Sequence, residues 1–97
     1  MANGELHDLV TRGLNEGLVE IRDDLMNLGV IGCGVRVGET AFYAFGPLTE
    51  EQDAAWVVEN VSVDMLVDDI TDAIEGLDET ERDYCACFLE ERLQDIK

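Results

Sequence analysis

The sequence is poor in basic residues. Its 97 residues include only 6 Lys and Arg against 23 Asp and Glu, which gives a formal net charge of −17, and the single Lys is Lys97. A chain with so few bases is unsuited to neutralising phosphates, which argues against direct binding to nucleic acid. A charge of this sign predicts a partner that is itself basic.

Long apolar runs are also missing. The uncharged stretches are too short to cross a bilayer. The segment Met1–Glu5 has neither the basic region nor the apolar core of a signal peptide. Apolar residues still make up 46% of the chain, which permits one packed core. We therefore expect a single acidic domain over residues 1–97, in the cytoplasm and without membrane contact.

Cysteine is scarce and odd in number. The three cysteines, Cys33, Cys85 and Cys87, suit reduced thiols better than a disulfide framework. Cys85-Ala86-Cys87 is the best candidate for a metal site, but a structural zinc site needs four ligands. The only other Cys and His residues that could serve as ligands are Cys33 and His7, and neither has a sequence spacing that relates it to Cys85 and Cys87. We expect no metal and no cofactor, with Cys85 in the core and Cys87 nearer the surface.

The first half of the chain predicts a helix and a hairpin. From Glu5 to Leu28, apolar residues recur in steps of three and four, which indicates one long amphipathic helix. Val30–Val37 and Thr40–Phe45 have the composition of two strands, and Gly38-Glu39 between them suits a two-residue hairpin turn. The apolar stripe of the helix consists of Leu6, Val10, Leu14, Leu18, Ile21, Leu25 and Leu28.

The second half predicts two to three helices. Thr49-Glu50-Glu51-Gln52 has the capping-box pattern, which places a helix over Glu50–Glu59. Ser62 and Asp78 are N-cap candidates for two further helices, and Gly76 ends the first of these. The apolar face of that helix consists of Val63, Leu66, Val67, Ile70, Ile74 and Leu77. The predicted class is α+β, with an N-terminal helix, a two-stranded antiparallel hairpin and C-terminal helices packed on it.

Patterns that would indicate an enzyme or a calcium site are missing. The sequence has no nucleophile elbow and no phosphate-cradling glycine loop. The single histidine, His7, has the position of a surface residue near the start of the first helix. As an EF-hand loop, Asp64–Glu75 would have Asp69 at its sixth position in place of glycine. The adjacent carboxylates of Asp68 and Asp69 point in different directions from a helix. We therefore predict a protein that is not an enzyme.

Acidic residues recur at helical spacing in the second half of the chain. Asp64, Asp68 and Asp72 are four residues apart on the face opposite the apolar one, about 6 Å apart along the helix axis. Each such pair destabilises a helix by roughly 0.2–0.5 kcal/mol, which favours a functional role. A groove that holds phosphates with Lys and Arg could accept these carboxylates instead. The candidate partner-binding residues, named here the acidic stripe, are Asp64, Asp68, Asp69, Asp72, Glu75, Asp78, Glu79 and Asp83.

In size, charge and helix-borne carboxylates, the sequence resembles the small acidic nucleic-acid mimics that phages use against bacterial defence, the anti-restriction and anti-CRISPR proteins. The resemblance rests on Asp64–Asp72 and Asp78–Asp83 together with the overall charge. It implies an inhibitor in the cytoplasm of a bacterial host. Such an inhibitor would bind a basic nucleic-acid-binding protein, with a type I CRISPR–Cas surveillance complex as the first target to test, and would exclude nucleic acid. The net charge further predicts a monomer.

Two other interpretations stay open. The chain could be an acidic adaptor or a secretion-type chaperone for a basic client, which would dimerise through the Leu6–Leu28 stripe. It could also be an ordinary small domain from a halophile, since halophilic surfaces are acidic and poor in Lys.

Overall fold

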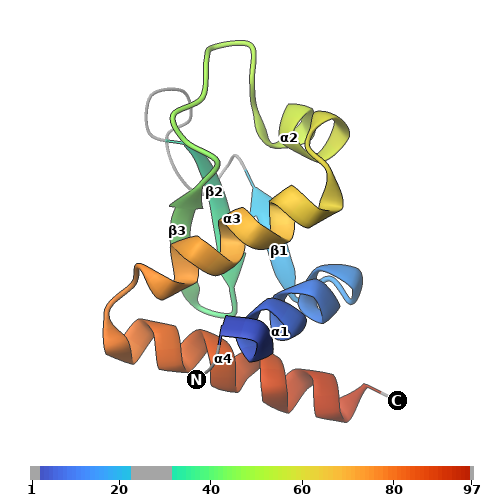
Figure 1. Cartoon of the computed structure of the whole chain (residues 1–97), viewed down its shortest axis with the longest axis vertical. Coiled ribbons are helices and arrows are strands. Elements are labelled where there is room, and N and C mark those ends of the chain that lie inside the picture. Colours follow the sequence, from blue (N-terminus) through green and yellow to red (C-terminus); the bar gives the residue numbers. More distant parts are fainter. Residues whose placement is uncertain (1–2, 23–31, 97) are drawn as a thin grey trace.

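The computed structural model describes residues 3–22 and 32–96. Three strands form one antiparallel sheet in the order β1-β2-β3. One helix, α3, crosses a face of this sheet, and α1 and α4 lie against each other at the end of the sheet where β2 turns into β3 (Figure 1). The predicted α+β class is confirmed. The sheet has three strands in place of the predicted two. The elements are α1 (Asn3–Asn15), β1 (Val19–Arg22), β2 (Cys33–Val37), β3 (Thr40–Ala44), α2 (Ala54–Asn60), α3 (Val63–Glu75) and α4 (Glu79–Asp95).

The first helix is shorter than predicted. It ends at Asn15, and Gly17 follows with a φ of 77°, a left-handed conformation that glycine adopts without steric cost. The N–H of Leu18 donates to the carbonyl of Gly13 at 2.8 Å, and the N–H of Gly17 donates to the carbonyl of Leu14 at 3.3 Å. This is a Schellman motif, which stops the helix by satisfying its last carbonyl groups.

The segment after this turn, predicted as helix, is strand β1. Leu18 and Ile21 fit a helical repeat, but Val19 and Ile21 fit the two-residue repeat of a strand equally well. The structure selects the strand because β1 pairs with β2, with Val19 opposite Val37. The remaining part of the predicted helix, residues 23–28, lies outside the described residues.

The predicted hairpin is present as β2 and β3. Val37 lies opposite Thr40, so Gly38-Glu39 forms the connecting turn. The N–H of Glu39 donates to Tyr84 Oη at 2.9 Å, which ties this turn to α4. The start of the predicted first strand, residues 30–31, lies outside the described part of the chain.

The core lies between the sheet and the helices. Leu6 and Val10 of α1 are 3% and 0% exposed, so these two residues of the stripe proposed for a dimer are used inside the fold, while Leu25 and Leu28 lie outside the described residues. At Gly13 a Cβ would lie 2.8 Å from Leu89 Cδ2 and 2.9 Å from Val19 Cγ2, so a larger residue there would force these two side chains to shift. The side chains with 0% exposure in this cluster are Val10, Val35, Val37, Ile70, Ile74, Cys85 and Leu89.

The caps of the two long C-terminal helices are confirmed. The Ser62 side chain accepts a hydrogen bond from the N–H of Met65, and Gly76 follows the last residue of α3. The Asp78 side chain accepts from the N–H of Glu81 at the start of α4. These caps satisfy N–H groups that a helix leaves without partners.

The start of α2 and the role of Val63 differ from the prediction. Gln52 Oε1 accepts from the N–H of Thr49, but this pattern forms a turn, and Asp53 caps α2 by accepting from the N–H of Trp56. Val63, predicted to be buried, is 62% exposed, because the first turn of α3 extends beyond the sheet (Figure 1). None of the helices in the described ranges is long and apolar enough to span a membrane.

Candidate partner-binding site

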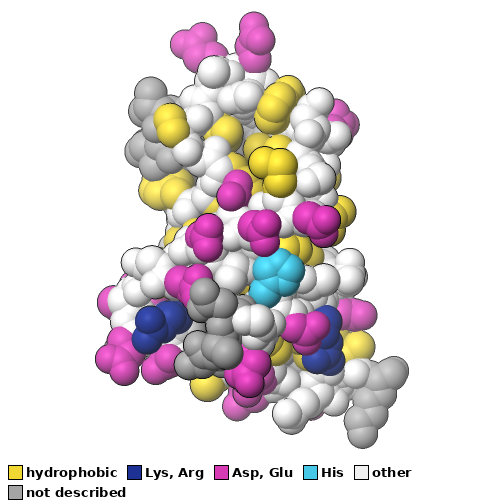
Figure 2. Space-filling model, viewed as in Figure 1, with side chains coloured by type: hydrophobic (Ala, Val, Ile, Leu, Met, Phe, Trp, Pro, Cys, Tyr) yellow, Lys and Arg dark blue, Asp and Glu magenta, His cyan; other side chains and the backbone are white. Residues whose placement is uncertain are grey.

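The outer face of α3 carries the centre of the acidic stripe. Asp64, Asp68 and Asp72 are exposed, while Ile70 and Ile74 of the same helix are 0% exposed. The predicted separation of a charged and an apolar face is therefore present on α3. Figure 2 shows a row of Asp and Glu side chains across this face, with Lys and Arg confined to its lower half.

Asp69 differs from its neighbours in the stripe because it is half-buried. Burial, followed by the nearby charges of Asp72 and Asp68, raises the pKa of its carboxyl group above the usual value. A raised pKa in the folded state means that protonation of Asp69 favours folding. Its contribution to stability is fully present below the usual pKa and is lost as the pH rises through the raised one. Because it is half-buried, Asp69 presents less of its side chain to a partner than the exposed carboxylates do.

The members of the stripe beyond α3 lie at the start of α4. Asp78, Glu79 and Asp83 are exposed, but the carboxylate of Asp78 is engaged as the cap of α4. A hydrogen bond with Asp78 raises the pKa of Glu81. In the turn between α3 and α4, the carboxylate of Asp78 is therefore already bound to the backbone of α4.

A cleft between α1 and α3, named here the α1–α3 cleft, brings stripe residues together with residues of α1. Its volume is about 400 Å³, and its lining consists of Gly4, His7, Asp68, Thr71, Asp72 and Glu75. His7 Nε2 lies 3.0 Å from Asp68 Oδ1, so the ring N–H donates to the carboxylate. The sequence indicated only a surface histidine, because 61 positions separate His7 from Asp68 and no local pattern links them.

Thr71 is the most buried residue of this cleft. It is 5% exposed, and its hydroxyl has no hydrogen-bond partner in the described part of the protein. Buried hydroxyl groups in folded proteins nearly always have a partner. Sequence reasoning did not select Thr71, because its spacing places it beside the apolar face of α3 and gives no sign that its hydroxyl is unpaired.

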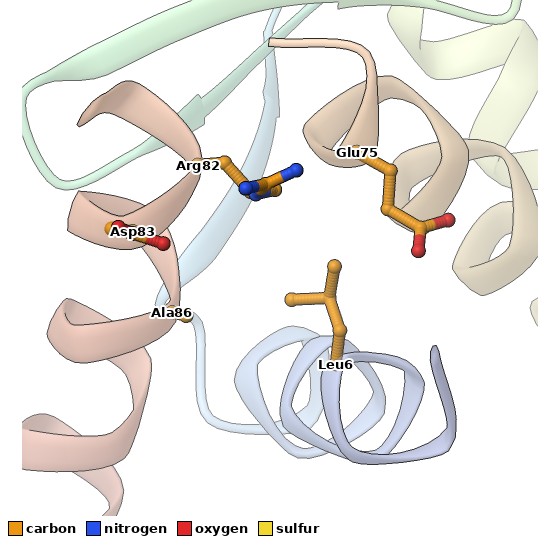
Figure 3. Close-up of a pocket in the computed structure, with 5 residues that line it drawn as sticks. All are labelled: Leu6, Glu75, Arg82, Asp83 and Ala86. Carbon is orange, nitrogen blue, oxygen red and sulfur yellow. The ribbon is translucent and has the colours of Figure 1, made fainter. Parts of the chain in front are cut away.

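A smaller pocket lies on the other side of Glu75. Its volume is about 140 Å³, and its lining consists of Leu6, Glu75, Arg82, Asp83 and Ala86. Figure 3 shows Arg82 on α4 extending toward Glu75 on α3, above Leu6 of α1. Glu75 therefore lines both cavities, and Arg82, the one base between Asp64 and Asp83, lies close to the acidic stripe.

The cysteines lie as predicted, with Cys85 buried and Cys87 exposed, and Cys33 is also buried. Within residues 3–22 and 32–96, no group of three or more His, Cys, Asp or Glu side chains is arranged to hold a metal ion. The absence of a metal and of a cofactor stays a prediction.

In the folded protein, we expect one thiol, Cys87, to react rapidly with a disulfide reagent. Cys33 and Cys85 are 0% exposed, and burial raises the pKa of Cys85 from 9.0 to about 11. The stability linked to Cys85 is present below pH 9.0 and is lost as the pH rises toward 11. Counting reacted thiols with and without denaturant tests this expectation. Rapid reaction of a second thiol in the folded protein would contradict it.

We expect Thr71→Val to stabilise the protein by about 1 kcal/mol, because the change removes a buried hydroxyl without a partner. For a domain of this size that is a rise in Tm of roughly 4–8 °C. Thermal unfolding followed by circular dichroism measures it, with Thr80→Val at an exposed position of α4 as the control. A lower Tm for Thr71→Val alone would show that the hydroxyl is satisfied in the native fold.

Comparison of the chain with protein-family models, with curated sequences and with solved structures found no significant match in any of the three.

Proposed function

We propose that this protein is a non-enzymatic inhibitor that binds a basic, nucleic-acid-binding protein through the acidic stripe and so blocks nucleic-acid binding. The observation that carries the proposal is the row of exposed carboxylates on the outer face of α3, from Asp64 through Asp68 to Asp72. These groups repeat about every 6 Å along the axis, a spacing similar to that of successive phosphates on one strand.

The mechanism is competition for a basic groove. The stripe lies on a helix held by a buried core, so its carboxylates are arranged before binding and little entropy is lost in ordering them. Lys and Arg side chains that would contact phosphates pair with Asp68 and Asp72 instead. Such pairs speed association at low salt and are screened as ionic strength rises.

Exposed apolar side chains at the start of α3 support a protein as the partner. Val63 and Met65, on either side of Asp64, are 62% and 56% exposed. Specific protein interfaces combine apolar contacts with charged groups at their rim. A surface adapted only to high salt has no need of apolar side chains beside its carboxylates. We infer that these two side chains contact the partner next to its basic groove.

The proposal is tested by DNA competition on a purified type I surveillance complex, the first target that the resemblance implies. Labelled target duplex is bound to the complex, and its release is measured as this protein is added at low and at raised salt. We expect release at low salt and weaker release at raised salt. Polyglutamate at the same total negative charge is the control for nonspecific competition.

A negative result on one complex is followed by the same assay on a single-subunit Cas effector and a restriction enzyme. If all three keep their DNA, or if polyglutamate releases it equally well, the proposed function is wrong.

A further inference from the structure

We propose that Val58 and Met65, named here the α2–α3 patch, bind the apolar face of a basic amphipathic helix in the partner protein. This inference rests on the proposed function and specifies the structural element by which the basic partner is recognised. It concerns apolar contacts beside the acidic stripe, which a purely electrostatic competitor would not need.

Exposed apolar side chains are concentrated where α2 meets α3. Among the described residues, five large apolar side chains are exposed, and three of them lie between residues 58 and 65. Val58 and Met65 are each 56% exposed. Their neighbours Val57 and Leu66 pack in one core cluster, which holds α2 against the start of α3 and brings the two exposed side chains to adjoining parts of the surface. Apolar side chains gathered on a surface commonly mark a contact site for another molecule.

The α2–α3 patch borders the acidic stripe. Met65 precedes Asp68 by three positions and Asp72 by seven, so the three side chains lie on the same face of α3. Figure 2 shows apolar side chains over α2 and the start of α3, directly above the row of Asp and Glu side chains. A molecule that covers Met65 therefore also meets these carboxylates, and it must present basic groups beside its own apolar ones. Val63 leaves the same turn in another direction and contacts a different part of the partner.

Charge decides between the possible occupants of the patch. A second copy of this chain would bring a further net charge of −17 against the stripe, which disfavours self-association. Anionic lipid headgroups would be repelled by the same carboxylates. A basic protein is attracted by them, and its apolar side chains remove Val58 and Met65 from water.

A helix suits this surface better than an extended segment. The patch lies on helices, whose backbone N–H and C=O groups are already paired, so an extended partner segment would leave its own backbone groups without partners there. A helix satisfies its own backbone groups and binds through side chains alone. Bases four positions apart on such a helix are separated by about 6 Å along its axis, the same spacing as that of Asp68 and Asp72.

The test is fluorescence anisotropy of a labelled Leu/Lys peptide of about 14 residues, close to four helical turns, in which the leucines recur in steps of three and four. One comparison peptide has the same composition in scrambled order, and another has Glu in place of Lys. We expect the protein to bind the amphipathic basic peptide at least about tenfold more tightly than the scrambled one, and not to bind the Glu peptide. Equal affinity for the scrambled peptide, or binding of the Glu peptide, would overturn the proposal.

Variants with a matched control locate the contact. Met65→Gln and Val58→Gln each make one exposed side chain of the patch polar, so the fold should be kept, which circular dichroism checks. We expect each to weaken binding of the amphipathic basic peptide about three- to tenfold. The control, Ile96→Gln, changes an apolar side chain that is 42% exposed at the end of α4 and should leave the affinity unchanged. Unchanged affinity in both folded patch variants, or peptide-induced amide shifts of the ¹⁵N-labelled wild type confined to α4, would overturn the proposal.

Sedimentation tests the other two occupants. We expect the wild-type protein to sediment as a monomer when alone, and not to pellet with vesicles of phosphatidylcholine and phosphatidylserine. A dimer, or vesicle binding, that Met65→Gln abolishes would assign the patch to a second copy or to lipid and overturn the proposal.

The peptide titration and the DNA competition fail separately. Peptide binding that depends on Met65, together with no release of DNA from any target, would leave the patch assignment standing and reject the proposed function. Release of DNA that is as strong with Met65→Gln and Val58→Gln as with the wild type would reject the patch assignment and keep the proposed function.

Discussion

Replacing Asp68, Asp72 and Glu75 together with Lys is expected to abolish binding to the partner while the fold survives. Each substitution exchanges a negative charge for a positive one, so the formal net charge moves from −17 to −11. Close charge pairs across an interface contribute about 1.5 kcal/mol or more each. Losing three pairs and adding repulsion should therefore weaken binding by at least about a thousandfold.

The fold of this triple variant should be intact because the three residues lie opposite the buried Ile70 and Ile74. Asp68→Lys also gives Asp64 an opposite charge four positions later, an arrangement that stabilises a helix. The lost contact between His7 and Asp68 joins two side chains that are 46% and 63% exposed, so its removal should cost little.

DNA competition measures the loss of inhibition, and circular dichroism checks the fold. The matched control replaces Glu90, Glu91 and Asp95 with Lys, which makes the same change in charge at exposed positions of α4. We expect this control to inhibit nearly as well as the wild type at moderate salt. A folded triple variant of α3 that blocks nucleic acid as well as the wild type would refute recognition through this face.

Ile70→Asp is expected to unfold the domain at neutral pH. Ile70 is 0% exposed and lies in the main core cluster with Val10, Phe42 and Leu89, which come from α1, β3 and α4. Losing the buried side chain costs about 2–5 kcal/mol, and a buried carboxylate without a partner costs several more. A small domain has a total stability of about 5–15 kcal/mol, so the change removes most or all of it.

Thermal unfolding and the spread of amide signals in an NMR spectrum measure this effect. Ile70→Val is the control at the same position and should cost only about 0.5–1.5 kcal/mol. A cooperative transition for Ile70→Asp near the wild-type temperature would show that α3 does not pack on the sheet through Ile70.

Features that depend on a few neighbouring residues could be predicted from the sequence. Ser62 and Asp78 cap the helices that follow them, because a cap needs only a short polar side chain two or three residues before the N–H groups that it satisfies. Gly38-Glu39 joins two strands for a similarly local reason. The exposed carboxylates of α3 follow from the helical repeat that also buries Ile70.

Features that depend on partners distant in the sequence could not be predicted. Apolar residues around Leu18 satisfy both a helical and a strand repeat, and only pairing with β2 makes Val19–Arg22 a strand. The start of α2 was ambiguous in the same way, because both Thr49 and Asp53 are suitable N-cap residues. Asp53 is the N-cap in the structure, since residues 49–52 form a turn before α2 begins. In each case two local structures have similar free energies, and tertiary contacts select one.

The candidate site has one part that is local to α3 and one part that depends on the packing of α1 against α3. The charge and the exposed row from Asp64 to Asp72 are local properties of one helix, so they could be read from residue spacing. The α1–α3 cleft, with His7 against Asp68 and the unpaired hydroxyl of Thr71, exists only because the core packs α1 beside α3. Packing of side chains from distant segments sets that geometry, and the spacing of residues along the chain cannot predict it.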